Sequence, residues 1–253
     1  MLDDDGGIEN LFFSLSSTSR IDILNAISVE TLKMNEIARK IDITPTEASR
    51  QIQRLLDEFI VQKLPDGSYI LTNYGRLILH FFPSLDFIFK HKQYFLVHDI
   101  WRLPYQFINR LGELSQGNLC TEMAEAVNKI QSMMQSSDEY VWVITDQAMS
   151  AHSNIMIEQV SKGVKFRSLI HEKINSGQVR VFGRNVERRV LSTIPALVVI
   201  TDKEALVSFL SMDGKIDYSG FFGSDPKFMK WITDLFLYYW DQTRRGYPQI
   251  NPT

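Results

Sequence analysis

Apolar residues recur at helical spacing in two neighbouring segments near the start of the chain. Asn35 to Ile41 predicts a short helix, and Thr44 to Phe59 predicts a longer one. The longer segment opens with Thr44-Pro45-Thr46-Glu47, a strong helix start. Its first threonine can cap the first turn, its proline needs no N–H there, and its glutamate can complete a capping box. The side predicted to face a core consists of Ala48, Ile52, Leu55, Leu56 and Phe59.

The opposite side of the longer helix is polar and carries side chains that can reach base edges or phosphates. A hairpin is predicted around Pro65-Asp66-Gly67-Ser68. Short helix, turn, polar-faced helix and hairpin together predict a winged helix-turn-helix, whose second helix enters the major groove of DNA. The predicted DNA-contacting residues are Thr44, Thr46, Ser49, Arg50, Gln53 and Arg54 on the helix and Lys63, Ser68 and Tyr69 in the wing.

The charge of this region does not decide which partner it binds. Residues 31 to 80 contain seven lysines and arginines and six acidic residues, so the region is close to neutral. A protein that relied on neutralising phosphates would be more basic, so we expect a dimer that adds two modest half-site contacts. A winged-helix protein–protein adaptor in a transcription complex remains the alternative. In the preceding helix, Arg20 is expected to be solvated, with a phosphate contact as the other option.

The rest of the chain predicts a helical segment followed by an α/β layer domain. Pro83 is expected to stop the helix that Thr72 caps. Residues 84–115 are too rich in aromatic residues for an exposed linker, and they either pack on the second domain or form a dimer contact. Beyond residue 139, strands alternate with helices. The predicted strands are Tyr140 to Thr145, Val164 to Ile170, Gln178 to Phe182, Pro195 to Thr201 and Ala205 to Leu210.

These patterns predict a two-domain protein of the α+β or α/β class. Its parts are a winged helix-turn-helix domain at 1–83, a helical connector at 84–138, and an α/β effector and dimerisation domain at 139–253. The last predicted helix, from Asp225 to about Arg244, is apolar nearly all round. It is therefore expected to be buried centrally or shared between two subunits.

Composition narrows the functional classes further. The chain has 253 residues, a formal net charge of −3 and a single cysteine, Cys120. One cysteine excludes an intrachain disulfide and a cysteine-rich metal site, and we expect an inert thiol. The acidic N-terminus lacks a signal peptide and no apolar run is long enough to span a membrane, so we expect a cytoplasmic protein. Two histidines and one aspartate are too few for a predicted metal site: His91, His98 and Asp99.

Four stretches and one turn of the chain carry a resemblance to a known family. They are Ser16 to Leu24, Ile70 to Leu79, Gln93 to Leu114, Asp234 to Trp240 and the turn at Asp202. On these residues the chain resembles archaeal winged-helix transcriptional regulators with a methanogenesis-regulator-type effector domain, a group related to arsenic-repressor-like winged helices. The resemblance implies an N-terminal DNA reader and a C-terminal effector domain, and it assigns no ligand.

The effector region also resembles, more faintly, phospholipase D-like folds. Their catalytic signature is His, any residue, Lys, four residues, Asp. With Asp202 as the aspartate, the other two positions are Pro195 and Leu197, which provide neither nucleophile nor phosphate clamp. The chain also lacks a Gly-rich phosphate loop, a nucleophile elbow and a His-Glu-x-x-His pair. We therefore expect no catalytic residues, no cofactor and no enzyme activity.

Basic residues between 165 and 189 offer candidates for an effector site. Arg167 and Arg180 can converge on a crevice at strand ends and hold a carboxylate or phosphate, although surface charge or salt bridges explain them equally. The candidate ligand-binding residues are Arg167, His171, Arg180, Arg184, Tyr218 and Phe222. The resulting hypothesis is a homodimeric regulator of transcription that binds double-stranded DNA and responds to a small anionic effector by changing the spacing of its readers.

Overall fold

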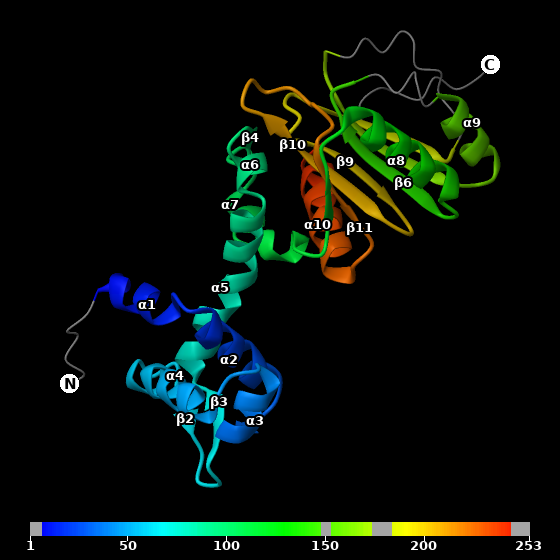
Figure 1. Ribbon diagram of the computed structural model, residues 1–253. Helices are drawn as coiled ribbons and strands as arrows, with labels where there is room; N and C mark the ends of the chain where they lie inside the picture. Colours follow the sequence, from blue (N-terminus) through cyan, green and yellow to red (C-terminus); the bar gives the residue numbers. More distant parts are fainter. Residues whose placement is uncertain (1–6, 148–152, 174–183, 244–253) are drawn as a thin grey trace, which may run out of the picture. The chain divides into compact units, whose positions relative to one another are not determined.

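A computed structural model describes residues 7–147, 153–173 and 184–243 of the chain (Figure 1). The protein is of mixed α/β class, and its C-terminal part is rich in sheet. The chain divides into two compact units, Met1–Phe82 and Pro83–Thr253. None of the helices in the described residues is long and apolar enough to cross a membrane.

The first unit contains four helices and a small antiparallel sheet among its described residues, before the helix that leads into the second unit. Its elements are α1 (Ile8–Leu15), α2 (Thr18–Val29), β1 (Leu32–Lys33), α3 (Met34–Lys40), α4 (Pro45–Asp57), β2 (Val61–Lys63) and β3 (Ser68–Leu71). The strand order is β1-β3-β2. Gly67 has a φ of +84° in the turn between β2 and β3, a conformation that glycine adopts without strain.

A compact apolar core joins α2, α3 and α4 to the sheet. Ile23, Ile37 and Leu55 from the three helices are fully buried there. Arg20 is also buried, at 3% exposure, which corrects the expectation of a solvated arginine. Each of its three guanidinium nitrogens donates one hydrogen bond: Nε to the Ser14 carbonyl oxygen, Nη1 to Gln51 Oε1 and Nη2 to the Phe13 carbonyl oxygen. A buried charge requires such partners, and α1 and α4 supply them.

Helix α5 (Asn73–Lys90) begins in the first unit and continues into the second. Thr72 caps it as expected, its Oγ1 accepting from the Gly75 N–H at 2.9 Å. The expectation that Pro83 stops this helix is wrong, because Pro83 lies inside it. Proline removes one helical hydrogen bond. Burial of Phe87, 1% exposed in the core of the second unit, favours continuation of the helix beyond that point.

Within its described residues, the second unit is built on a mixed eight-stranded sheet. The elements after α5 are α6 (Lys92–Phe95), β4 (His98–Asp99), α7 (Tyr105–Ile108), the 3₁₀ helix η1 (Leu111–Leu114), β5 (Asn118–Cys120), α8 (Met123–Ser136), β6 (Tyr140–Thr145), α9 (Ser153–Ser161), β7 (Lys165–His171), β8 (Val186–Leu191), β9 (Ala196–Thr201), β10 (Ala205–Ser211), β11 (Gly220–Gly223) and α10 (Pro226–Gln242). The strand order is β5-β11-β10-β9-β6-β7-β8, with β4 paired to β10.

Strands β6, β7 and β8 run parallel to one another, whereas the other neighbouring strands pair antiparallel. The predicted strands Pro195 to Thr201 and Ala205 to Leu210 are confirmed as β9 and β10, which form an antiparallel hairpin with Ile200 opposite Ala205. Strand β8 was not predicted, because its sequence VERRVL carries three charges in six residues and its side chains are only half-buried. The predicted strand Gln178 to Phe182 lies outside the described residues.

Helices cover both faces of this sheet (Figure 1). On one face, α10 packs through Phe236 on Trp142 of β6 and through Trp231 on Phe209 of β10. On the opposite face lies α8, whose Lys129 Nζ is 5.1 Å from the ring centre of Phe222 in β11. The last helix was expected to be buried centrally or shared between two subunits, and six of its side chains are buried within this unit: Phe228, Trp231, Ile232, Leu235, Phe236 and Trp240.

The buried Arg20 network makes a testable contribution to stability. We expect Arg20→Met to lower the free energy of unfolding by about 2 kcal/mol, since it removes hydrogen bonds from a charged donor and leaves buried acceptors unpaired. The control is Arg39→Met at an exposed position of α3, which is expected to change stability by less than about 0.5 kcal/mol. Urea denaturation of both variants measures the difference. Equal losses would contradict a special role for Arg20.

Candidate nucleic-acid interface

The start of α4 forms as its sequence dictates. Thr44 is the N-cap, its Oγ1 accepting from the Glu47 N–H at 3.2 Å, and Pro45 occupies the first helical position. The predicted capping box is only half formed. Instead of returning to the cap, the Glu47 carboxylate accepts from the Ser19 hydroxyl of α2 at 3.5 Å. The first turn of α4 is therefore tied to α2.

Helix α4 separates a buried side from a polar side. Ala48, Gln51, Ile52 and Leu55 are buried against the core. Phe59 was predicted on this side and is instead 64% exposed. The helix ends at Asp57, and Phe59 takes a φ of +55°, which turns its side chain away from the row that the helical spacing defines.

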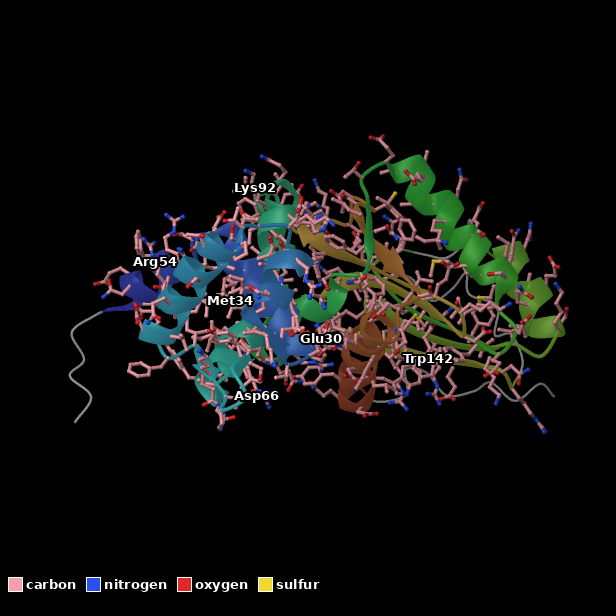
Figure 2. The ribbon with its side chains drawn as sticks, turned by 60° about the horizontal axis from the view of Figure 1, so that its bottom comes forward. Glu30, Met34, Arg54, Asp66, Lys92 and Trp142 are labelled. Atoms are coloured by element: carbon pink, nitrogen blue, oxygen red, sulfur yellow. The ribbon has the colours of Figure 1, made fainter. Side chains whose placement is uncertain are left out.

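The polar side of α4 is exposed along its whole length. A shallow surface depression on this side is lined by Met34 of α3 and by Pro45, Thr46, Ser49, Arg50, Gln53 and Arg54 of α4. Figure 2 labels Arg54 at the edge of the first unit. Within the described residues the guanidinium groups of Arg50 and Arg54 have no hydrogen-bond or ion-pair partner, whereas Gln53 Nε2 donates to Asp57 Oδ1 at 2.7 Å. Two unpaired cations on one exposed helical face can bind phosphates or the acceptors of guanine.

A buried hydrogen bond fixes the orientation of this face. Arg20 Nη1 of α2 donates to Gln51 Oε1 of α4 at 2.8 Å. Burial lowers the pKa of Arg20, and the nearby charge of Arg54 lowers it further. Rotating α4 about its axis would break this bond and leave the guanidinium with one acceptor fewer.

The hairpin offers fewer contacts than the sequence predicted. Lys63 is exposed, but Ser68 and Tyr69 are buried at 3% and 8% exposure, which leaves their side chains little surface for the predicted DNA contacts. Tyr69 pairs with Leu32 and Lys63 at the centre of the sheet. The tip presents Asp66 (Figure 2), whose pKa is lowered by hydrogen bonds from the Ser68 hydroxyl and N–H. A carboxylate at this tip repels a phosphate.

The candidate effector residues of the second unit do not form one site. Arg167 lies on the α10 side of β7, where its guanidinium is 5.2 Å from each of the Trp142 and Trp240 rings and 3.7 Å from Glu187. Phe222 lies on the opposite face, under Lys129. Arg184 is exposed in the turn before β8, and Arg180 lies outside the described residues. Arg167 therefore belongs to a stack of cations and aromatic rings.

Two of the predicted residues do gather at the carboxyl ends of β6 and β7. His171 ends β7, and Asp146 and Gln147 follow β6 in the parallel pair. The Tyr218 hydroxyl lies 2.5 Å from Gln147 Oε1. Burial raises the pKa of Asp146, and His171 opposes that rise. Sequence reasoning missed Asp146 and Gln147, although their place directly after a buried strand was a usable signal.

The other chemically notable residues have structural partners. His98 lies with Nδ1 2.8 Å from the Tyr94 carbonyl oxygen and Nε2 3.0 Å from Asp217 Oδ2. Burial raises the pKa of the Cys120 thiol, in keeping with the expected inert cysteine. Asp202 accepts from the N–H groups that precede β6. No group of three or more potential metal ligands occurs within the parts of the chain that the structure covers.

Comparisons with known proteins return only distant similarities. No family model matches the chain. No curated protein matches it either. The structure is similar to that of TrmBL2, described as an archaeal chromatin protein with a novel mode of DNA binding, at 12% identity and a TM-score of 0.45, covering 91% of this chain and 94% of that one.

Two further solved structures are each similar to about half of the chain. NucT from Helicobacter pylori has 16% identity and a TM-score of 0.41 over 52% of this chain and 98% of its own. Nuc, a phospholipase D family member from Salmonella typhimurium, has 16% identity and a TM-score of 0.37 over 48% and 91%. Because these TM-scores lie below 0.5, none of the similarities supports an assignment of function.

The two sides of α4 predict different responses to truncation. Leu55→Ala is expected to cost about 2–5 kcal/mol of unfolding free energy, because it opens a cavity in the core. Phe59→Ala is expected to stay within about 0.5 kcal/mol, because that ring is already exposed. Thermal or urea unfolding measures both. A large loss in Phe59→Ala would show that the ring is buried in solution.

Proposed function

We propose that this protein is a sequence-specific, DNA-binding regulator of transcription that acts as a homodimer. In this proposal α3 and α4 form the helix-turn-helix, β2 and β3 form the wing, and α4 enters the major groove. The observation that supports this proposal most directly is the exposed polar face of α4. Two guanidinium groups on it have no partner within the described residues. Side chains of this kind read guanine and adenine edges through paired hydrogen bonds.

The element order supports this interpretation. A short helix, a turn and a capped helix are followed by an antiparallel hairpin, and a third helix packs behind them. The second helix of such a unit must present its polar side outward while its apolar side is held firmly. Here Ile52 and Leu55 provide the apolar anchor, and Gln51 provides the polar one.

The proposed reader is tested by selecting bound duplexes from a random pool with the full-length protein. Affinity for the enriched sequence is then measured in increasing salt. We expect Arg50→Ala with Gln53→Ala to weaken specific binding by at least about tenfold, since each base contact is worth about 1–3 kcal/mol. Wild-type binding should weaken as salt rises, because phosphate contacts release counterions.

Lys227→Ala is the matched control for this experiment. It removes one exposed positive charge from α10 in the second unit and leaves α4 intact. Its specific affinity should stay within about twofold of wild type. If the double variant binds the enriched sequence as tightly as Lys227→Ala does, α4 is not the reader.

A winged-helix adaptor that binds protein is the second candidate function. The observation that favours it is the acidic character around the proposed DNA-contacting surface. Asp66 is at the tip of the hairpin, and Asp57 is exposed at the end of α4. Failure to enrich any DNA sequence at low salt would favour this candidate over the first.

We further propose that the second unit binds a small effector at the carboxyl ends of β6 and β7. The support is the position of His171 and Tyr218, since ligands of α/β sheets bind at this edge. Inorganic phosphate is the simplest anionic probe. At ten times its dissociation constant it should stabilise the protein by about 1.4 kcal/mol, a rise of a few degrees in melting temperature.

His171→Ala is the variant that locates this effect. The rise in melting temperature should be absent in His171→Ala and retained in His80→Ala, an exposed histidine of α5. A rise of equal size in both variants would place the anion elsewhere. No rise in the wild-type protein would contradict an anionic effector at this edge.

A further inference from the structure

Tyr218 takes a backbone conformation that a bulky side chain rarely adopts. Its φ is +67°, in the left-handed region, where the Cβ atom comes too close to the following carbonyl oxygen. A residue stays in such a region only when surrounding contacts determine its position, and residues of this kind cluster where ligands bind. The Tyr218 hydroxyl lies 2.5 Å from Gln147 Oε1, just beyond β6. The contacts that hold Tyr218 therefore bear on the proposed effector site.

Both chain neighbours of Tyr218 are fixed by hydrogen bonds. Asp217 Oδ2 lies 3.0 Å from Nε2 of His98, and Asp217 Oδ1 accepts from the Ser219 N–H at 2.9 Å. The Ser219 carbonyl oxygen accepts from the Tyr94 hydroxyl at 3.1 Å. Because Ser219 is only 7% exposed, water cannot easily replace these partners. Tyr218 is thus held from both sides along the chain.

The residues that hold these neighbours come from α6 and β4 and are themselves buried. Tyr94 and His98 are each 4% exposed, and their rings stack with centroids 3.7 Å apart and planes inclined by 12°. The Tyr94 hydroxyl also accepts from the Phe209 N–H of β10 at 2.9 Å. Burial raises the pKa of Tyr94, which keeps this hydroxyl protonated and able to donate. We call Tyr94, His98 and Asp217 the Tyr218 anchor.

From this chain of contacts we infer that the Tyr218 anchor positions the Tyr218 hydroxyl at the proposed effector site. Without the bond to His98, Asp217 can turn its carboxylate to water, and the backbone of Tyr218 can relax to a conformation of lower energy. Tyr94 and His98 are positioning residues, since they act on Tyr218 through its neighbours. The sequence separation of 119 residues between His98 and Asp217 hides this role from local patterns. The inference rests on the proposed function, because Tyr218 belongs to the proposed effector site.

A fluorine label on Tyr218 reports its position without any ligand. Fluorotyrosine is incorporated at position 218 of the full-length protein, and its fluorine NMR resonance is recorded. We expect a resonance displaced from that of free fluorotyrosine, because the ring is partly buried. Asp217→Ala should move the resonance most of the way to the free position. His98→Phe should do the same, since it keeps a ring to stack on Tyr94 but loses the hydrogen bonds.

Asp217→Asn is the rescue variant, and Asp213→Ala is the matched control. Asparagine keeps an oxygen acceptor and adds an amide donor, so both hydrogen bonds of the native carboxylate can form and the resonance should stay in place. Asp213 lies in the same connection between β10 and β11, but its carboxylate pairs with Lys215 at 2.8 Å. Its removal should also leave the resonance in place. No movement in Asp217→Ala, or an equal movement in Asp213→Ala or Asp217→Asn, would overturn the inference.

Inorganic phosphate links the Tyr218 anchor to the proposed effector site. The rise in melting temperature that we propose for the wild-type protein should be lost in Asp217→Ala and kept in Asp213→Ala and Asp217→Asn. Both alanine variants remove one negative charge from the same connection, which by itself favours binding of an anion. A loss confined to Asp217→Ala therefore reports position and not charge.

The two measurements separate this inference from the proposed function. If the wild-type protein does not respond to phosphate, the proposed anionic effector is contradicted, while the fluorine resonance still decides whether the Tyr218 anchor positions Tyr218. If phosphate stabilises wild type and Asp217→Ala equally although the resonance has moved, the role of the Tyr218 anchor at the effector site is overturned.

Discussion

The hydrogen bond from Arg20 to Gln51 holds together the part of the protein that we propose to read DNA. It joins α2 to α4 inside the first unit, where neither group can exchange its partner for water. Two apolar anchors, Ile52 and Leu55, hold the same side of α4. With that side fixed, Arg50 and Arg54 have to face outward. The candidate interface is thus a consequence of how the buried side of α4 is held.

The second unit depends on a different constraint, the burial of α10 against the sheet. Helix α10 carries Trp231, Phe236 and Trp240, three large aromatic side chains that have to be buried. Strands β6, β9 and β10 provide the apolar surface that covers them. Arg167 and Arg189 pack over the Trp240 ring at the end of this layer. This stack gives Arg167, the most prominent basic candidate of the sequence, aromatic neighbours within the second unit.

Local sequence signals predicted those helix starts and turns that depend on neighbouring residues alone. Thr44 and Pro45 define the start of α4, and the turn between β9 and β10 follows from Thr201 to Glu204. Contacts between distant residues were not predictable in this way. Arg20 finds Gln51 across 31 residues, so its burial is invisible to local patterns.

Strand register and turn geometry account for further differences between the predicted and the observed positions of residues. Tyr69 was placed in the wing, but its pairing with Leu32 brings it into the sheet. A single residue with positive φ turned Phe59 out of the core. At the carboxyl ends of β6 and β7, Asp146 comes near His171 only through the parallel pairing of two strands that are separated in sequence.

Photo-cross-linking from α4 to DNA tests the central claim most directly. In a Cys120→Ser background, Ser49→Cys is labelled with a photoactivatable aryl azide and irradiated on the selected duplex. The account predicts cross-links to bases within the selected sequence from Ser49→Cys, and none from Val29→Cys, an exposed position at the end of α2. Cross-linking from Val29→Cys but not from Ser49→Cys, on the same bound duplex, would contradict it.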